Sequence, residues 1–558
     1  MKEKKIELST LSNIKVQVCD GCVRNLGIRS ADRDRTPVFP SLGTEVPGRL
    51  RMTPWAIAQK CFLFGFGTIF LLGGALLSGF WPSIYRTVIE PQLMLRNDTR
   101  TFAMWREPPV PIYMDFYLFH WANPERTLDG TEKPKFVEKG PYVFREYHKK
   151  ENITWNENST VTFMQVRKWI FMKNLTRTNL SLDDTITSVN PIFFTVASLL
   201  KSKDLSLIKR LAIEAALRAI QTKPYVSKSV RQLLYEGYDD PLLAALDKLP
   251  QKIFPHPAMA KKFGWFYPHN MSSEFDGICN VGTGVDSLKN LGVLNSWNYN
   301  SRTEFFEGKC GKVKGTTGDL WPPSSAKENN VTLFASDLCS SLVLQENGRM
   351  SMDGLDGTTF VGAENVFDNG TLFPENKCYL ANGTQLRKGV RSLSSCRFGA
   401  PILISFPHFY LADEFYAKAI DGVSPSAENH QFKISLEKNT GIPLIVNARL
   451  QINVQSSPTP GYGIFDKLPE ITLPALWFDQ HMLVSRELAD GIWIVSVMPA
   501  YIMYSLIAVS MLGAVLIIYG ILLVRRDCKS SPDSAELLKD TDEPAITSAP
   551  TESPVPNQ

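Results

Sequence analysis

Residues 491–524 read GIWIVSVMPAYIMYSLIAVSMLGAVLIIYGILLV, from Gly491 to Val524, and contain no Asp, Glu, Lys, Arg or His. A helix rises about 1.5 Å per residue, so about two dozen of these residues would cross a hydrocarbon core of about 30 Å. Soluble helices seldom stay uncharged over such a length. The run therefore predicts a membrane-spanning helix, which Pro499 either begins or kinks and which Arg525 and Arg526 anchor in lipid headgroups.

A second uncharged run extends from Cys61 to Tyr85, between Lys60 and Arg86. A cleaved signal peptide would begin nearer the N-terminus and would end at a small-x-small cleavage site. The run has neither property, and we interpret it as a first transmembrane helix.

Charge at the ends of the two runs indicates the orientation. Lys and Arg precede the first run and follow the second, which places both termini in the cytoplasm by the positive-inside rule. The N-terminal tail has little apolar periodicity, and we expect it to be disordered. The predicted domains are a cytoplasmic tail (1–55), a transmembrane helix (56–85), a glycosylated, disulfide-bonded ectodomain (86–490), a second transmembrane helix (491–524) and a cytoplasmic tail (525–558).

N-glycosylation acceptors test this topology, because they belong on the lumenal or extracellular side. Nine N-x-S/T sequons occur, and all nine lie between the two apolar runs. We expect glycans at Asn97, Asn152, Asn158, Asn174, Asn179, Asn270, Asn330, Asn369 and Asn382.

The nine cysteines divide by compartment. Five lie in the predicted ectodomain, where an oxidising environment favours disulfides, and an odd number leaves at least one without a partner in the chain. In the N-terminal tail, Cys19 and Cys22 have the spacing of half a zinc site, but residues 1–60 hold no further Cys or His, so we expect no metal. Cys61 and Cys528 flank the membrane and are candidates for palmitoylation.

Between the two runs, the periodicity changes from strand to helix and back. Short alternating segments bounded by Pro and Gly predict antiparallel strands, for example 111–119, 142–147, 161–166, 401–406 and 441–453. Residues 189–249 instead show helical spacing and an excess of basic residues. These residues could form a positive binding surface, but the interpretation that they are ordinary solvated helix faces has at least equal weight. Candidate ligand-binding residues there are Lys201, Lys203, Lys209, Arg210, Lys223 and Lys228.

Six blocks of sequence carry a family resemblance. In order, they are NPERTLDG (123–130), EKGPYVFRE (138–146), GTTGDLWPP (315–323), CRFGAP (396–401), PHF (407–409) and LPALWF (473–478). They resemble the successive signature blocks of the class B scavenger receptor family, which includes lipoprotein and fatty-acid receptors, a lysosomal integral membrane protein and sensory neuron membrane proteins. The resemblance extends over residues 60–525.

This resemblance implies an α+β membrane protein whose ectodomain has an antiparallel β-barrel core, an apical helical bundle (189–249) and an internal apolar tunnel. It implies binding of lipids, lipoproteins or other anionic ligands, with lipid transfer through the tunnel to the membrane. It also implies the disulfides Cys310–Cys378 and Cys339–Cys396. Leu380 stands where some members have a further cysteine, and Cys279 has no assigned partner.

Two other functions compete with lipid transfer. One is a lysosomal sorting receptor for a protein cargo, because Asp533, Leu537 and Leu538 fit an acidic dileucine signal for clathrin adaptors. Against it, no His lies between His148 and His256 to release cargo in acid. The other is a two-helix oligomeric ion channel, although neither apolar run carries an internal charge.

Composition and motifs exclude other classes. The net charge of +4 gives no sign of nucleic-acid binding. No hydrolase, metalloprotease or P-loop motif occurs, so we expect neither an enzyme nor a cofactor, and we expect His408 to be structural. The expected location is the plasma membrane, the endosome–lysosome membrane or both, and a homo-oligomer is possible.

Overall fold

The computed structural model describes residues 54–201, 206–246, 261–267, 269–273, 276–380 and 386–529. The described residues divide into two units, residues 63–519 and residues 54–62 with 520–529. In the second unit, the Lys60 ammonium lies 2.5 Å from the Asp527 carboxylate. The predicted sorting residues, Cys19, Cys22 and nearly all of both predicted tails lie outside the described residues.

Within the described residues, two helices are long and apolar enough to cross a membrane. The first apolar run forms α1 (Pro54–Ile84), which continues through the π-helical turn Tyr85–Ile89 into α2 (Glu90–Leu93). The second run is divided between α10 (Arg486–Ser496) and α11 (Met498–Lys529). Pro499 is the second residue of α11, where its missing N–H costs no helical hydrogen bond, so it begins the spanning helix.

The two spans approach closely through small residues. A Cβ on Gly74 would lie 2.7 Å from the backbone nitrogen of Ser510, so only glycine fits there. The Ser510 hydroxyl donates to the carbonyl of Leu71 at 3.1 Å. Small residues and hydroxyl groups commonly join helices inside a membrane.

Thirteen strands form one antiparallel sheet in the order β7-β6-β3-β2-β1-β15-β14-β13-β10-β9-β8, with β12 on β14 and β11 on β12. Two further strands, β4 (Thr185–Val189) and β5 (Tyr225–Ser229), pair with each other. The sheet strands are β1 (Ile112–Trp121), β2 (Phe136–Asn156), β3 (Thr160–Phe171), β6 (Ile278–Gly282), β7 (Leu294–Trp297), β8 (Asn330–Ala335), β9 (Ser340–Met352), β10 (Leu355–Val361), β11 (Arg391–Ser392), β12 (Ile402–Ser405), β13 (Lys433–Glu437), β14 (Pro443–Ser456) and β15 (Ile471–Leu483).

One segment bridges the two edges of this sheet. The carbonyl of Gly315 accepts from Leu294 of β7 at 2.8 Å, and the carbonyl of Thr316 accepts from Phe334 of β8 at 2.8 Å. The Thr316 N–H donates back to Thr332 of β8 at 3.1 Å. These bonds satisfy edge groups that would otherwise be open for pairing. The sheet is therefore a nearly closed barrel.

The strands next to the membrane helices pair with each other. β1 follows α3 (Arg100–Arg106), and β15 leads into α10. Their register places Ile112 opposite Met482 and Phe116 opposite Phe478. Buried residues such as Phe116 and Leu118 alternate along β1, as expected for a strand with one face in the core. All five strand segments predicted from periodicity overlap strands, namely β1, β2, β3, β12 and β14, although 111–119, 401–406 and 441–453 extend one or two residues beyond them.

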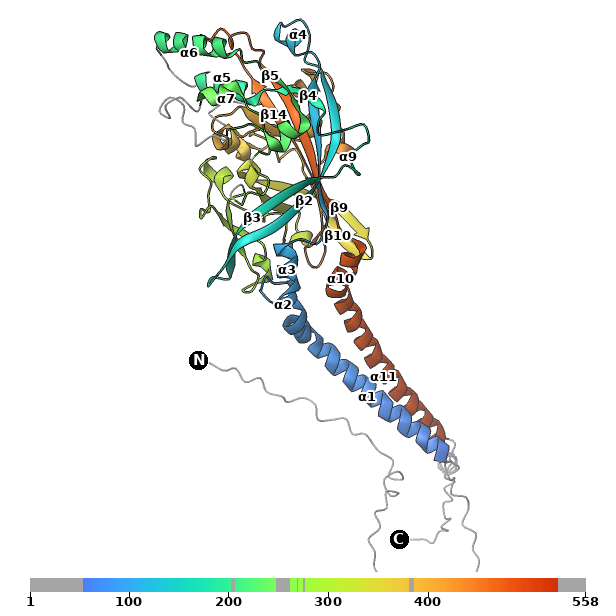
Figure 1. Cartoon of the computed structure of the whole chain (residues 1–558). Helices are drawn as coiled ribbons and strands as arrows, with labels where there is room; N and C mark the ends of the chain where they lie inside the picture. Colours follow the sequence, from blue (N-terminus) through green and yellow to red (C-terminus); the bar gives the residue numbers. More distant parts are fainter. Residues whose placement is uncertain are drawn as a thin grey trace, which may run out of the picture. The chain divides into compact units, whose positions relative to one another are not determined.

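The region predicted as a helical bundle contains α5 (Pro191–Lys201), α6 (Leu207–Ile220), α7 (Pro241–Leu246) and the π-helical turn Gln232–Glu236 (Figure 1). Helix does not fill the interval, because residues 225–229 form β5. The apolar residues of α6 also do not share one buried face. Ile208 and Leu211 are 80% and 57% exposed, whereas Leu217 is buried. The other short helices are α4 (Pro124–Leu128), α8 (Glu414–Lys418) and α9 (Ala427–His430).

Two disulfides staple the loops between the later strands. They join Cys310 to Cys378 and Cys339 to Cys396, which are the pairs implied by the family resemblance. Cys279 is a buried free thiol on β6. Burial raises its pKa to about 12, so it stays protonated and unreactive at neutral pH.

Candidate functional site

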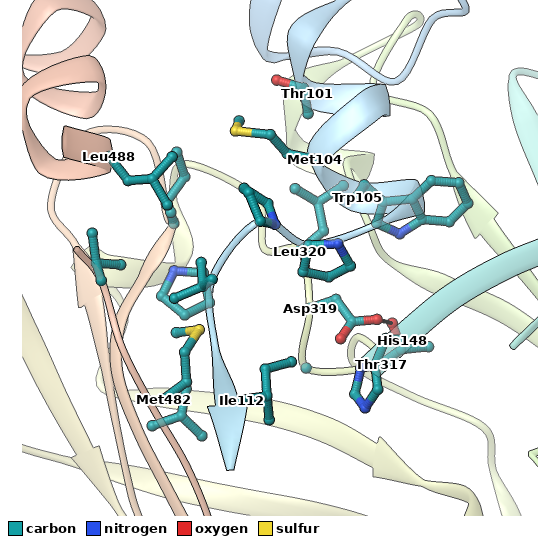
Figure 2. Close-up of a pocket in the computed structure, with 18 of the residues that line it drawn as sticks. Thr101, Met104, Trp105, Ile112, His148, Thr317, Asp319, Leu320, Met482 and Leu488 are labelled. Atoms are coloured by element: carbon teal, nitrogen blue, oxygen red, sulfur yellow. Dashed lines mark hydrogen bonds between the residues drawn. The ribbon is translucent and has the colours of Figure 1, made fainter. Parts of the chain in front are cut away.

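A cavity of about 430 Å³ lies between α3, α10 and strands β1, β14 and β15. Its walls are largely apolar, with Met104, Ile112, Met482 and Leu488 among them (Figure 2). We call it the lower cavity, because α10 leads into the membrane helix α11. Its size falls within the range of about 300–1,000 Å³ that is typical of small-molecule sites.

A second cavity of about 800 Å³ begins at the helical end of the unit. Ile192, Thr195 and Leu199 of α5 and Leu243 of α7 line it, together with the aromatic segment 263–267. We call it the upper cavity. The side chains of Met114, Leu450 and Phe478 continue its wall along the interior of the barrel.

The two cavities share part of their walls. Five of the shared residues are polar, although the surrounding barrel interior is mostly apolar. We call these shared residues the septum; they are Gln165, Arg167, Thr317, Asp319, Leu333, Phe432, Ala448 and Gln480.

Strand geometry explains why charged side chains meet at the septum. Successive side chains of a strand point to opposite faces, so Glu146, His148 and Lys150 of β2 point inward together. On β3, Arg167 lies opposite His148, and Gln165 lies opposite Lys150. Lys150 is completely buried. The barrel thus holds a layer of ionisable groups at mid-height.

Ion pairs satisfy this layer. Arg167 donates from Nη2 and Nε to Asp276 at 2.7 and 2.8 Å, and Lys150 donates to Asp319 at 2.9 Å. His148 Nε2 lies 2.7 Å from Glu146 Oε1. Burial acts to raise the pKa of Asp319, but Lys150, His148 and Arg167 together outweigh burial and hold that pKa below its usual value.

In the same layer, the pKa values of Glu146 and Asp337 are shifted in opposite directions. Burial acts to raise the pKa of Glu146, yet His148 and Arg167 keep that pKa below its usual value. For Asp337, burial prevails over Arg167, and its pKa is raised. The polar residues of the septum and the charged groups around them therefore form a dense polar network inside an otherwise apolar interior, which is costly unless its groups are paired.

The signature block 315–323 contributes directly to this arrangement. Its first residues bridge β7 and β8, and its next residues place Thr317 and Asp319 at the septum. A sequence profile of the CD36 family matches residues 65–524. The chain belongs to the CD36 family.

Individual members of the CD36 family align over most of the chain. Protein peste of Drosophila melanogaster is 32% identical over 431 residues, covering 77% of this chain and 76% of peste. Scavenger receptor class B member 1 of Sus scrofa is 30% identical over 462 residues, covering 82% of this chain and 88% of the receptor. Lysosome membrane protein 2 of Homo sapiens is 31% identical over 409 residues, covering 72% of this chain and 81% of that protein. These matches confirm the predicted resemblance, and the nearly closed barrel between two long apolar helices confirms the fold class.

The basic residues predicted to bind ligand do not line either cavity in the described part of this CD36-family chain. Lys223 lies 3.2 Å from Glu125, and Lys228 stands over the Tyr238 ring at 5.1 Å. Lys201 and Lys209 are exposed, Arg210 is half-buried, and Lys203 lies outside the described residues.

The predicted glycosylation sites differ in exposure. Seven are exposed, namely Asn97, Asn152, Asn158, Asn174, Asn179, Asn270 and Asn330. Asn369 is only 3% exposed, and its amide nitrogen, which would carry the glycan, donates to Leu386 and Arg387 carbonyls at 2.6 and 3.2 Å. Asn382 lies outside the described residues. A glycan at Asn369 would require this segment to open.

Sequence reasoning missed the charged residues of β2 and β3. A signal was present, because Glu146, His148 and Lys150 continue the every-second-residue phase of Tyr142 and Phe144, which are buried. Aromatic residues on both faces of the strand hid this phase: Tyr147, on the outer face, is substantially exposed.

A second buried polar group surrounds His408. Glu138 Oε2 accepts from His408 Nε2 at 2.6 Å and from Trp477 Nε1 at 2.7 Å. His430 stacks on His408 with ring centroids 4.3 Å apart, and its Nδ1 accepts from the Ser426 N–H at 2.9 Å. Neither histidine lines a described cavity, and this setting agrees with a structural role for His408.

Acid should destabilise the fold through His430. Burial, and then the neighbouring His408, lower the pKa of His430 to about 4. Between this value and the ordinary pKa of about 6.5, the unfolded state binds more protons, so stability falls as pH falls. The largest loss from this residue is about 3 kcal/mol by pH 4, at 1.36 kcal/mol per pKa unit.

Denaturant unfolding of the solubilised full chain at neutral and acid pH measures this effect. His430→Gln should reduce the change in the free energy of unfolding between about pH 6.5 and pH 4. His481→Gln is the control with the opposite sign, because Asp115 raises the pKa of His481 against the effect of burial. An unchanged slope in His430→Gln would contradict the assignment.

Proposed function

We propose that this protein is a membrane receptor that captures lipid or lipoprotein at its helical end and passes lipid through the ectodomain to the bilayer. The observation that carries the proposal is the pair of cavities with a shared wall, one reached by α5 and α7 and the other by α10. Each CH₂ group exposed to water costs about 0.8 kcal/mol, which an apolar passage avoids.

Several further assignments belong to this proposal. Residues 86–490 would be the ectodomain, and both termini would lie in the cytoplasm. Exposed basic residues on α5 and α6, such as Lys201 and Lys209, would attract anionic surfaces of lipid carriers. Residence at the plasma membrane, in endolysosomes or both is consistent with the family members described above, which include a lysosome membrane protein.

Obstruction of the septum tests the passage. Ala448 of β14 lines both cavities and pairs in register with Gln480 of β15. An Ala448→Trp substitution would fill the shared wall with an indole ring. We expect transfer of a fluorescent acyl lipid into cells that express the full chain to fall at least about tenfold, equivalent to about 1.4 kcal/mol.

The matched control is Ala427→Trp, which adds the same ring at an exposed position at the start of α9. It should leave transfer unchanged at equal surface expression. Normal transfer by Ala448→Trp would contradict passage through the cavities.

A second candidate function is sorting of a protein cargo. The exposed Ile208 and Leu211 on α6 favour it, because large apolar side chains on a surface suit a protein partner. The Ala448→Trp variant separates the two functions, since cargo binding on α6 needs no passage through the barrel.

A further inference from the structure

The lower cavity is chemically asymmetric. Figure 2 shows His148, Thr317 and Asp319 grouped at one end, while Met104, Met482 and Leu488 line the rest. A site with apolar walls and polar groups at one end suits an amphiphile, whose tail contacts the walls and whose head contacts the polar end. The chemistry of that end determines which head fits.

The bases near the septum are already paired. Lys150 faces Asp319 at 2.9 Å, and Arg167 faces Asp276 at 2.7 Å. Arg397, which lines the upper cavity, lies 4.0 Å from Asp337 and donates to the backbone carbonyl of that residue at 2.6 Å. A fourth acid, Glu146, faces His148 at 2.7 Å. Each basic group described at this end thus already faces an acid, which leaves no unpaired cation to bind an anionic head.

At the polar end of the lower cavity, most of the side-chain atoms that still lack a hydrogen-bond partner are acceptors. Gln165 donates its amide to Asp276 at 3.2 Å, and Gln480 donates its amide to Glu146 at 2.7 Å. Because a carboxylate only accepts, these contacts fix the NH₂ side of each carboxamide toward an acid. The two carboxamide oxygens have no partner among the described residues.

Two further groups follow the same pattern. Asp319 uses Oδ2 for Lys150, and no described residue bonds its Oδ1. His148 presents Nε2 to Glu146, and its Nδ1 also has no partner in the described chain. A hydroxyl group can donate to Asp319 Oδ1 and to the two carboxamide oxygens, and it can either donate to or accept from His148 Nδ1, whereas a carboxylate head has no proton to donate.

We propose that this end of the lower cavity is a headgroup site for an uncharged single-chain lipid whose head carries hydroxyl groups, such as a monoacylglycerol. The inference deepens the proposed lipid-transfer function and rests on it. The head lies against Gln165, Asp319 and Gln480, and the acyl chain extends along the apolar wall toward α10. A volume of about 430 Å³ limits the site to a single chain.

Two probes with the same acyl chain test the site, 1-oleoylglycerol and oleate. Binding of each to the full chain in detergent is measured by native mass spectrometry at about pH 8, where oleate carries its charge. The wild type should bind 1-oleoylglycerol at least about tenfold more tightly, a difference of about 1.4 kcal/mol. Equal binding, or tighter binding of oleate, would overturn the proposal.

Two near-isosteric variants probe the head contacts. Gln165→Met removes a hydrogen-bond acceptor and should weaken the binding of 1-oleoylglycerol about fivefold, which is within the energy range of one hydrogen bond. The binding of oleate should not weaken. Glu146→Gln removes the carboxylate that occupies His148 and Arg167, and it should tighten the binding of oleate about fivefold. A structural role alone would not change the preference between two lipids with the same chain.

The matched control is Gln92→Met, which changes the same residue type elsewhere in the lower cavity. The backbone carbonyl of Gln92 accepts a hydrogen bond from the Thr101 hydroxyl at 2.6 Å. Figure 2 places Thr101 away from Asp319. This variant should bind both probes like the wild type. Equal effects of Gln165→Met and Gln92→Met would overturn the headgroup site. If the wild type binds neither probe and transfers no lipid, the proposed function itself fails.

Discussion

Gly315→Ala should lower the free energy of unfolding by at least about 4 kcal/mol, because it forces apart the segment that bridges the two sheet edges. Gly315 has φ = +86°, where an L residue is strained. A Cβ there would lie 2.0 Å from the carbonyl oxygen of Thr332 and 2.4 Å from its carbon. The backbone cannot move away without breaking the bonds from Thr316 to β8.

Gly318→Ala is the matched control three residues later. Gly318 has φ = +91°, but a Cβ there would meet nothing within 4 Å. It should therefore show only the conformational strain, about 1–2 kcal/mol. Denaturant unfolding of the solubilised full chain, followed by tryptophan fluorescence, measures both variants. Equal losses would mean that edge closure does not depend on the close approach to Thr332.

Arg167→Met should be the other strongly destabilising change, with a loss of about 4 kcal/mol. Arg167 holds Asp276 through two hydrogen bonds and lies 3.8 Å from both Glu146 and Asp337. Its removal leaves buried carboxylates without their cation, and an uncompensated buried charge costs more than the pair contributes. The same unfolding assay measures the loss.

The control for the loss of an arginine is Arg349→Met, at an exposed position on β9, which should change stability by less than about 0.5 kcal/mol. The double variant Arg167→Met, Asp276→Asn should recover part of the loss, because neighbouring sites couple by about 0.5–3 kcal/mol. If Arg167→Met costs no more than Arg349→Met, the septum network is not a stabilising element.

Hydropathy and periodicity predicted the elements whose environment is uniform along their length. Both membrane helices were evident, because lipid excludes charge over a complete span. The strands were evident where Phe116 and Leu118 alternate with less buried neighbours, and the family blocks implied the disulfides of Cys310 and Cys339. The position of Pro499 allowed two interpretations, which the break between α10 and α11 decides.

The septum was not predicted, because its members come from strands far apart in the chain. Gln480 of β15 meets Glu146 of β2 only through the long-range strand order. Similarly, the alternation on α6 did not show which residues would be covered, since Ile208 has the same helical spacing as Leu217 but stays exposed. Local pattern indicates a helix, whereas tertiary packing decides which side of it is buried.

The pairing of β1 with β15 has a mechanical consequence. Each strand is separated by only a few residues from a helix that leads toward the bilayer, through α3 on one side and α10 on the other. Ile112 and Met482, at the start of one strand and near the end of the other, are locked in register. Both connections lie at the same end of this antiparallel pair, so a force that separates the two helices acts first on the hydrogen bonds at that end. The starts of the two helices can therefore move apart only if the β1–β15 pair opens in the middle of the sheet order, so the folded barrel holds them close together.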